Sequence, residues 1–258
     1  MPDNWEWFIK NFELLSHIDL TAYKRPQMER RINSFMRSAS VPDYKEFISL
    51  LKTDANLYRK FLDHITINVS EFFRNANHWE ILEKQVIPGL LKNRSELKIW
   101  SAGCSTGEEP YSLAMMLKEN RVNLTDKILA TDLDQEVLAK AAQGIYTAKA
   151  AQGIPPAYLA RYFTAQGENY QAKDELKNMI KFQRHDLLKD NFNKDFDLIL
   201  CRNVVIYFTE ETKSKLYRRF ADAMRPGGVL FIGSTEQIFQ ARELGLKSVA
   251  TFFYQKES

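Results

Sequence analysis

The chain has 258 residues and a formal net charge of +3, with 45% hydrophobic and 27% charged residues. These values are ordinary for a globular protein, and the length suits either one large domain with an appendage or two domains. The weak positive charge gives no reason to expect a nucleic acid partner. No apolar run reaches the length of a membrane span, and the opening MPDNWEW lacks the layout of a signal peptide. We therefore expect a cytoplasmic protein without membrane insertion.

Residues 1–90 are predicted to form a domain of short helices, because no strand-like alternation of any length occurs there. In the helix expected at Gln27 to Arg37, four apolar residues share one stripe: Met28, Ile32, Phe35 and Met36. The opposite face carries Arg30 and Arg37, and Arg31 lies at its border. A charged face of this kind is most often simply solvated, and an acidic partner is the second interpretation.

The segment from Thr66 to Asn75 breaks the helical pattern. It contains Asn68 and Ser70, whose side chains can form hydrogen bonds, followed by two phenylalanines and Arg74. One interpretation is a helix start capped by Ser70. The next stretch, ANHWEILEKQVIP, is predicted to be a helix that ends at Pro88, and a linker then leads into a second domain at residues 91–258.

A turn with two glycines, SAGCSTGEEPYS, follows the apolar run LKIW and precedes a helical pattern. Gly103 and Gly107 tolerate positive φ and let the backbone approach a ligand at the end of a parallel sheet. The next predicted strand, KILATDLD, ends in Asp132, whose carboxylate would lie where doubly wound folds bind ribose hydroxyls. Either feature alone has an ordinary structural explanation, but the pair favours a nucleotide-like cofactor.

Strands and helices alternate through the rest of the chain, which predicts an α/β sheet. Residues 144–178 interrupt this alternation and are predicted to form a small inserted subdomain with short polar strands. FDLILCRNVVIYF, from Phe196 to Phe208, is predicted to be a strand buried on both faces, and SVATFFYQK one closing strand.

The cysteines and histidines show no pattern typical of a metal site. The two cysteines, Cys104 and Cys201, belong to no CxxC or Cys/His cluster, and the four histidines lack ligand spacing. We therefore expect buried free thiols and no metal.

The chain resembles the CheR family, S-adenosylmethionine (SAM) dependent methyltransferases that esterify glutamates on bacterial chemoreceptors. The resemblance runs nearly end to end and rests on INVSEFFR, SAGCSTGEEPYSLAM, ATDLD, FDLILCRNVVIYF and RPGGVLFIGSTE, in this order. It implies a helical N-terminal domain and a doubly wound, Rossmann-like SAM-methyltransferase sheet with a final antiparallel strand and a small inserted β-subdomain. It also implies that the cytoplasmic helices of methyl-accepting chemoreceptors are the partners, and the surface expected to meet them carries Arg30, Arg31 and Arg37. We expect a monomer.

The resemblance also implies which residues form the site. Cofactor contacts are expected from residues in the quoted motifs and in the HDLL sequence: Asn68, Ser70, Arg74, Gly103, Glu109, Asp132, Asp186, Leu187, Arg202 and Asn203. Of these, Asp132 is implied to hold the ribose and Asp186 with Leu187 the adenine. Arg202 and Asn203 are implied to line the methionine side.

Arg74 and Tyr207 resemble the residues that lie next to the reacting groups in the family. Relatives often carry threonine at the position of Ser70 and asparagine at that of Asp186, which are chemically close replacements. Neither difference puts the cofactor in doubt.

The chemistry of the residues agrees with a sulfonium cofactor, which leaves S-adenosyl-L-homocysteine as product. Glu108 and Glu109 would repel a pyrophosphate at the start of the following helix, whereas a sulfonium is cationic. A substrate glutamate, with a reference pKa of about 4.3, is ionised at neutral pH and needs no general base. The reaction then depends on alignment in a dry site, so Arg74 is expected to position the carboxylate more than to activate it.

Three functions from different classes remain open. The favoured one is a protein-glutamate O-methyltransferase; the others are a SAM methyltransferase acting on nucleic acid or a small molecule, and a non-catalytic SAM-binding adaptor. RNVVIYF lacks the Asn-Pro-Pro-aromatic type of motif, which disfavours the second, and the presence of Arg74 and Tyr207 disfavours the third. A dinucleotide oxidoreductase ranks lower because GxGxxG is incomplete.

Overall fold

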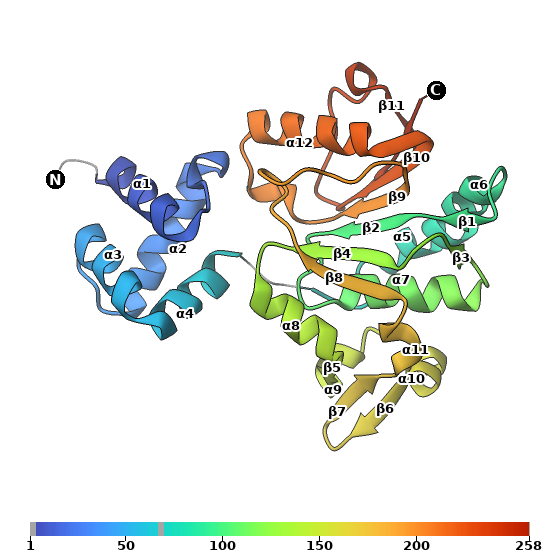
Figure 1. Cartoon of the computed structure of the whole chain (residues 1–258), viewed down its shortest axis with the longest axis horizontal. Coiled ribbons are helices and arrows are strands. Elements are labelled where there is room, and N and C mark those ends of the chain that lie inside the picture. Colours follow the sequence, from blue (N-terminus) through green and yellow to red (C-terminus); the bar gives the residue numbers. More distant parts are fainter. Residues whose placement is uncertain (1–3, 67–69, 258) are drawn as a thin grey trace. The chain divides into compact units, whose positions relative to one another are not determined.

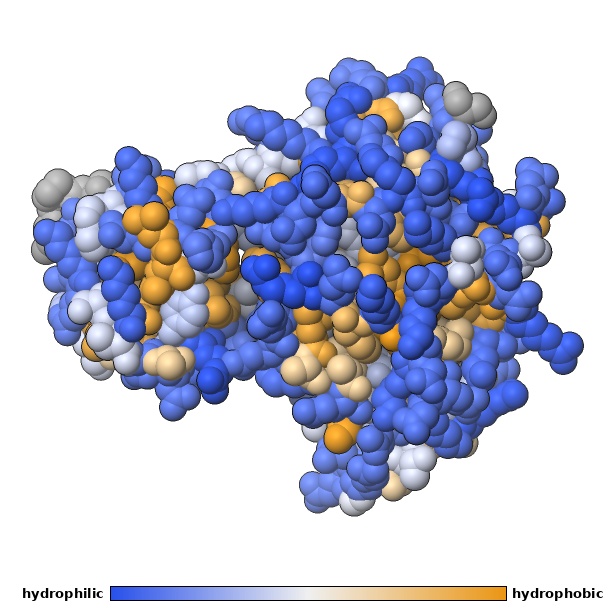
Figure 2. Space-filling model, in the orientation of Figure 1, coloured by the Kyte–Doolittle hydropathy of each residue, from blue (hydrophilic) through white to orange (hydrophobic). Residues whose placement is uncertain are grey.

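The computed structural model describes residues 4–66 and 70–257, which form two compact units (Figure 1). The first unit comprises Met1–Asn68 and Tyr207–Lys213, and the second comprises Val69–Ile206 and Ser214–Ser258. None of the helices within these described ranges combines the length and apolar composition needed to cross a bilayer. On the face shown in Figure 2, hydrophilic side chains cover most of the surface and apolar residues appear in small groups.

The first unit is helical. Its elements are α1 (Trp5–Ser16), η1 (Leu20–Ala22), α2 (Arg25–Ser38), α3 (Tyr44–Thr53) and α4 (Ala55–Thr66). Aromatic rings form its core: Phe61 of α4 lies 5.3 Å from Phe12 and 4.8 Å from Phe47, measured between ring centroids. The predicted apolar stripe of α2 is buried, as the helical period requires. Arg31 does not stand free on the opposite face, because its guanidinium donates to the carbonyl of His64 on α4.

A short segment that lies far along the chain completes this helical unit. The carbonyl of Tyr207 accepts a hydrogen bond from the amide of Lys24 (2.9 Å), and the amide of Thr209 donates to the carbonyl of Ala22 (2.9 Å). The rings of Tyr23 and Phe208 pack edge to face. Residues 207–209, which are distant in sequence, therefore form part of the first unit.

The helical stretch before the sheet consists of α5 (Ala76–Ile81), a π-helical turn η2 (Leu82–Val86) and α6 (Ile87–Leu91). The prediction that the helix ends at Pro88 was wrong. A proline inside an α-helix clashes with the carbonyl four residues earlier, but here the wider π turn comes first and Pro88 occupies the first turn of α6. Trp79 and Leu90 of this stretch are buried in the core of the second unit, although the sequence prediction placed the helical domain as far as residue 90.

The second unit is built on a seven-stranded sheet with the order β11-β12-β10-β9-β2-β4-β8. Its strands are β2 (Ile99–Ala102), β4 (Ile128–Asp132), β8 (Ile180–Arg184), β9 (Phe196–Cys201), β10 (Met224–Ile232), β11 (Leu246–Ala250) and β12 (Phe253–Lys256). The strands from β10 to β8 are parallel, whereas β12 runs antiparallel to both of its neighbours. Helices α7 (Glu108–Glu119) and α8 (Gln135–Gln143) lie on one side of the sheet and α12 (Glu210–Ala223) on the other (Figure 1). This arrangement confirms the predicted doubly wound α/β class.

Two predicted strands have different ends in the structure. The strand expected at Phe196–Phe208 stops at Cys201, because Asn203 adopts a left-handed φ of 60° and η3 (Val205–Tyr207) follows. The single closing strand is instead a hairpin of β11 and β12, since Phe252, with a φ of 69°, reverses the chain between them. All six residues of β9 are buried, as predicted for a central strand.

The inserted subdomain contains a three-stranded antiparallel sheet with the order β5-β7-β6. Its elements are β5 (Ile145–Thr147), α9 (Ala148–Ala151), α10 (Pro156–Tyr162), β6 (Phe163–Gln166), β7 (Asn169–Ala172) and α11 (Asp174–Lys177). Tyr146 is buried and its hydroxyl donates to the carbonyl of Thr106 beside the glycine turn (2.8 Å). The remaining short elements are β1 (Glu96–Leu97), β3 (Asn123–Leu124) and η4 (Arg242–Leu244).

Candidate active site

The glycine turn between β2 and α7 is closely packed. Gly103 and Gly107 have φ values of 80° and 96°, so the predicted positive φ is confirmed at both. A Cβ atom on Gly103 would lie 2.4 Å from the Cγ2 atom of Val204, which leaves no room for a side chain. The amides of Gly103 and Cys104 donate to the carbonyl of Thr131 at 2.8 and 2.9 Å. The turn is thereby attached to the carboxyl end of β4.

Asp132 ends β4 at this same edge. Its Oδ2 accepts a hydrogen bond from the amide of Ser105 (2.8 Å) and its Oδ1 one from the amide of Asp134 (3.1 Å). Burial raises the pKa of Asp132, and these backbone bonds oppose that rise. Each carboxylate oxygen has a second lone pair that can accept from a ligand hydroxyl.

Asp186 and Leu187 lie at the end of β8. The amide of His185, which precedes them, donates to the carbonyl of Asp132 (2.9 Å), so all three residues are at the same edge of the sheet. Leu187 is buried. Oδ1 of Asp186 accepts a hydrogen bond from the amide of Leu188 (2.8 Å), which holds its carboxylate in a local turn.

A recess opens beside the glycine turn and brings together residues from four parts of the second unit. Its lining residues are Ser70, Glu71, Arg74, Gly103, Cys104, Ser105, Glu109, Arg202 and Asn203. Six of the predicted site residues are among them. Asp132 is one hydrogen bond away, through the amide of Ser105. The predicted Asn68 falls outside the described residues.

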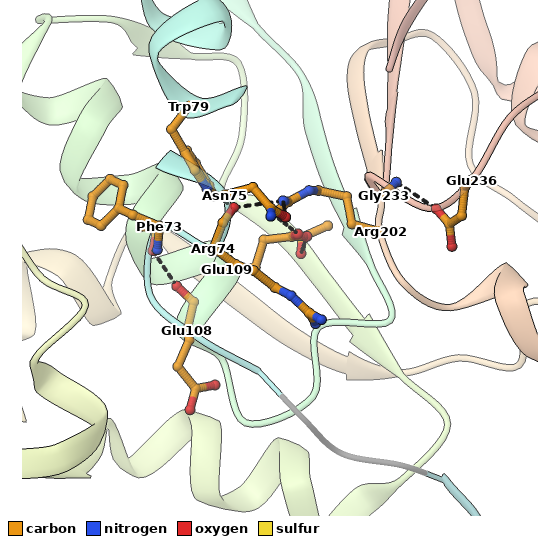
Figure 3. A network of polar contacts seen from close by, with 11 residues as sticks. Phe73, Arg74, Asn75, Trp79, Glu108, Glu109, Arg202, Gly233 and Glu236 are labelled. Atoms are coloured by element: carbon orange, nitrogen blue, oxygen red, sulfur yellow. Dashed lines mark hydrogen bonds and ion pairs between the residues drawn. The ribbon is translucent and has the colours of Figure 1, made fainter. Parts of the chain in front are cut away.

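Glu109 and Arg202 form a buried ion pair in this recess (Figure 3). The hydroxyl of Ser101 donates to Oε1 of Glu109 (2.8 Å), while Nη1 of Arg202 lies 3.4 Å from Oε2. Burial raises the pKa of Glu109, and the positive charge of Arg202 opposes that rise. Burial lowers the pKa of Arg202, although a guanidinium stays protonated in proteins. The recess therefore presents a carboxylate and a guanidinium side by side.

The segment that carries Arg74 is not a helix start. Phe73 and Asn75 both have left-handed φ values, 50° and 62°, and α5 begins only at Ala76. The carbonyl of Arg74 accepts from Nη2 of Arg202 (2.7 Å) and from Nε1 of Trp79 (3.1 Å), as Figure 3 shows. The amide of Phe73 donates to the hydroxyl of Ser112 (2.9 Å). These bonds fix the backbone that directs Arg74 into the recess.

Glu236 supports the recess from the loop after β10, a role that the sequence did not indicate. It is buried, and its Oε2 accepts from the amide of Gly233 (2.6 Å). Burial raises the pKa of Glu236, while hydrogen bonds from the amides of Gly233, Asn203 and Val205 oppose that rise. The sequence signal that could have identified Glu236 is its position in GSTE, directly after a buried strand.

The chemistry of the recess fits the amino acid end of a SAM molecule. Glu109 can accept from an ammonium group, and Arg202 supplies a positive charge beside it for a carboxylate. Ser105 Oγ and Arg202 Nε are buried and have no hydrogen-bond partner within the described residues. The two cysteines are buried and free, as predicted, and no metal-holding group of three or more His, Cys, Asp or Glu residues occurs in the described ranges.

Tyr207 belongs to the helical unit, and its approach to the recess stays a prediction. The roles assigned above to the site residues also stay predictions, although the structure places most of them in one recess or along one sheet edge.

Comparison with known proteins identifies both parts of the chain. The CheR methyltransferase all-alpha domain matches residues 3–66, and the CheR methyltransferase SAM binding domain matches residues 68–252. The chemotaxis protein methyltransferase of Listeria innocua serovar 6a is 48% identical over 93% of this chain and 92% of its own length. The one from Borreliella burgdorferi is 37% identical over 91% and 88%, and the one from Escherichia coli K12 is 34% identical over 85% and 79%. SAM is thus the cofactor, and the chain belongs to the CheR family of SAM-dependent methyltransferases.

Proposed function

We propose that this methyltransferase esterifies glutamate side chains on bacterial chemoreceptors and thereby acts in chemotactic adaptation. The observation that carries the proposal is the recess in which Arg74 stands beside the buried pair of Glu109 and Arg202. The relatives named as chemotaxis protein methyltransferases support the choice of substrate.

Bound SAM supplies an electrophilic methyl group on a sulfonium. In the proposal, Glu109 and Arg202 hold the amino acid end of the cofactor, and Asp132 accepts from the ribose hydroxyls. Ser70, Gly103 and Asn203 complete the methionine side, Asp186 and Leu187 contact the adenine, and Asn68 contributes from outside the described residues.

Arg74 positions the substrate carboxylate. A glutamate carboxylate is already ionised at neutral pH, so no residue has to remove a proton before the methyl group is attacked. Opposite charges disappear as the bond forms, and a guanidinium that held the carboxylate too tightly would stabilise the ground state more than the transition state. The planar fork of Arg74 therefore aligns the oxygen, and Tyr207 is proposed to lie beside the reacting groups.

The surface proposed to meet the receptor is the exposed arginine face of α2. Arg30 and Arg37 are exposed there, whereas Arg31 is half-buried and bonded to the carbonyl of His64. We narrow the proposed docking residues to Arg30 and Arg37, which can attract acidic receptor helices. A cytoplasmic monomer that binds no nucleic acid is part of this proposal.

The test is to incubate the protein with methyl-labelled SAM and membranes that carry chemoreceptors. Label on the receptor that mild base releases as methanol supports a glutamate ester. Base-stable label would indicate N-methylation instead, and label in added RNA or in a small molecule would favour another substrate. SAM binding without any transfer would indicate a non-catalytic adaptor.

A further inference from the structure

The segment that directs Arg74 into the cofactor recess also borders a second and larger hollow. This groove has a volume of about 560 Å³, which lies in the range of ligand sites. Three parts of the second unit form it: the segment from Glu71 through α5 and η2, the α7 residue Met116, and the stretch from Gln152 to Tyr158, which includes the start of α10. Among the described residues, only Glu71 and Arg74 line both hollows.

Aromatic side chains line the groove. The ring of Phe73 lies 5.3 Å from that of Trp79 and 5.9 Å from that of Tyr158, measured between centroids. Pro155 and Pro156 are exposed and also line the groove, and their rings restrict the backbone there. Such a preformed apolar surface suits a bulky side chain that inserts as an anchor.

The charges around the groove are mainly negative. Glu71, Glu80 and Glu83 line it, and Arg74 is the one basic residue among the described lining residues. Lys84 forms an exposed ion pair with Glu80, whereas Glu83 is held by the neutral side chain of Asn120 (2.7 Å).

We propose that this groove binds a segment of a protein partner in which an arginine or lysine stands beside a bulky apolar side chain. The apolar side chain packs on the half-buried ring of Phe73, and the cation lies between Glu83 and the ring of Tyr158, where carboxylate attraction and cation–π contact act together. A segment rich in glutamate is repelled. The proposal goes beyond the methyl transfer and does not depend on which carboxylate is methylated.

Occupation of the groove affects the cofactor recess through their shared wall. Trp79 lines the groove and donates to the carbonyl of Arg74, which also accepts from Arg202. The ring of Phe73 packs on Trp79, so a ligand that contacts Phe73 acts through Trp79 on the backbone that holds Arg74 in place. Because coupling between two sites is reciprocal, SAM changes the affinity for the segment by the same factor as the segment changes the affinity for SAM.

The experiment measures binding of fluorescently labelled octapeptides to the full chain by anisotropy. The panel places arginine, lysine, glutamine or glutamate next to tryptophan, leucine or alanine in an otherwise fixed sequence. Peptides that combine a cation with tryptophan or leucine should bind saturably and at least tenfold more tightly than the matched glutamate peptides. Added NaCl should weaken this binding.

Variants locate the site. Glu83→Gln removes one carboxylate charge and keeps an acceptor for Asn120, and Tyr158→Ala removes one ring. Glu83→Gln should weaken binding of the cationic peptides about fivefold and Tyr158→Ala about tenfold. Glu168→Gln, on the exposed turn between β6 and β7, should stay within twofold of wild type.

Two results would overturn the proposal. One is a panel in which no peptide with a cation and an apolar anchor binds better than its glutamate counterpart. The other is wild-type peptide affinity in both groove variants. A SAM affinity within twofold of wild type, measured by calorimetry, shows that each variant is folded. Peptide binding is measured without methyl transfer. A negative result in the methylation assay of the proposed function would therefore not affect this test.

Discussion

Nη1 of Arg202 lies 3.4 Å from Oε2 of Glu109, and their side chains are only 3% and 13% exposed. Residues that are 93 positions apart in the sequence thus form a nearly dry ion pair. Desolvation of two charges usually cancels most of their attraction, so such a pair is weak support for stability alone. Its place in the recess agrees with the proposal that Glu109 and Arg202 hold the amino acid end of SAM.

Replacing Glu109 by glutamine should destabilise the fold and weaken SAM binding. Arg202 would keep its charge without a buried counterion, which typically costs about 3 kcal/mol of unfolding free energy. Denaturant unfolding and calorimetry measure the two effects, with Glu168→Gln as an exposed control. An unchanged unfolding free energy would mean that other groups compensate Arg202.

SAM affinity should fall on acidification at a pH above the ordinary carboxyl range, which centres on about 4. Burial raises the pKa of both Asp132 and Glu109 in the free protein, and SAM binding is expected to need their ionised forms. Protons are then released when SAM binds, so affinity increases with pH until both groups are ionised. Calorimetry in buffers of different ionisation enthalpy counts these protons.

Asp132→Asn provides the matched comparison for that pH dependence. It should lower SAM affinity and reduce the number of protons released, because one of the two titrating groups is gone. Identical proton release in the variant and the wild type would remove Asp132 from the titration.

Arg74→Lys should lower kcat by roughly 100-fold while SAM affinity changes far less. Lysine keeps the charge but replaces the planar fork with a flexible point charge, so alignment of the substrate carboxylate is lost. Single-turnover rates at saturating SAM, with binding measured on the same variant, separate the two roles. Near wild-type kcat would contradict positioning, and wholesale loss of SAM binding would make Arg74 a cofactor residue.

Arg30→Glu combined with Arg37→Glu should raise KM for receptor and leave SAM affinity intact. Both side chains are exposed on α2, so neither change disturbs the core. Salt should raise the wild-type KM in the same direction, because exposed charges are screened. If the double variant has the wild-type KM at low salt, this face is simply solvated.

Glu236→Gln should weaken SAM binding through Asn203. Oε2 of Glu236 accepts from the amide of Gly233, and the amides of Asn203 and Val205 also stabilise the carboxylate charge. Glutamine is neutral, so the attraction between this charge and the three amides is lost. A several-fold rise in the SAM dissociation constant is expected. A lower Tm with an unchanged SAM dissociation constant would contradict this prediction and would show that Glu236 contributes only to stability.

Several features of this protein follow from local sequence. The positive φ of Gly103 and Gly107, the buried stripe of α2 and the burial of β9 depend on residues that are neighbours in the chain. Side-chain period and the conformational freedom of glycine act over a few positions, so pattern alone determines them. The order of the quoted motifs likewise identified the family and its cofactor.

Tertiary structure decided what depends on distant partners. β9 ends at Cys201 because Asn203 turns into a left-handed conformation beside Gly233 and Glu236, which arrive from the end of β10. The sequence placed Arg31 at the border of the arginine face, and in the structure its guanidinium donates to the carbonyl of His64, 33 residues later. Only folding brings such groups within hydrogen-bond distance. Buried polar atoms form hydrogen bonds with groups that can be far away in the sequence, and a local sequence pattern does not reveal which groups these are.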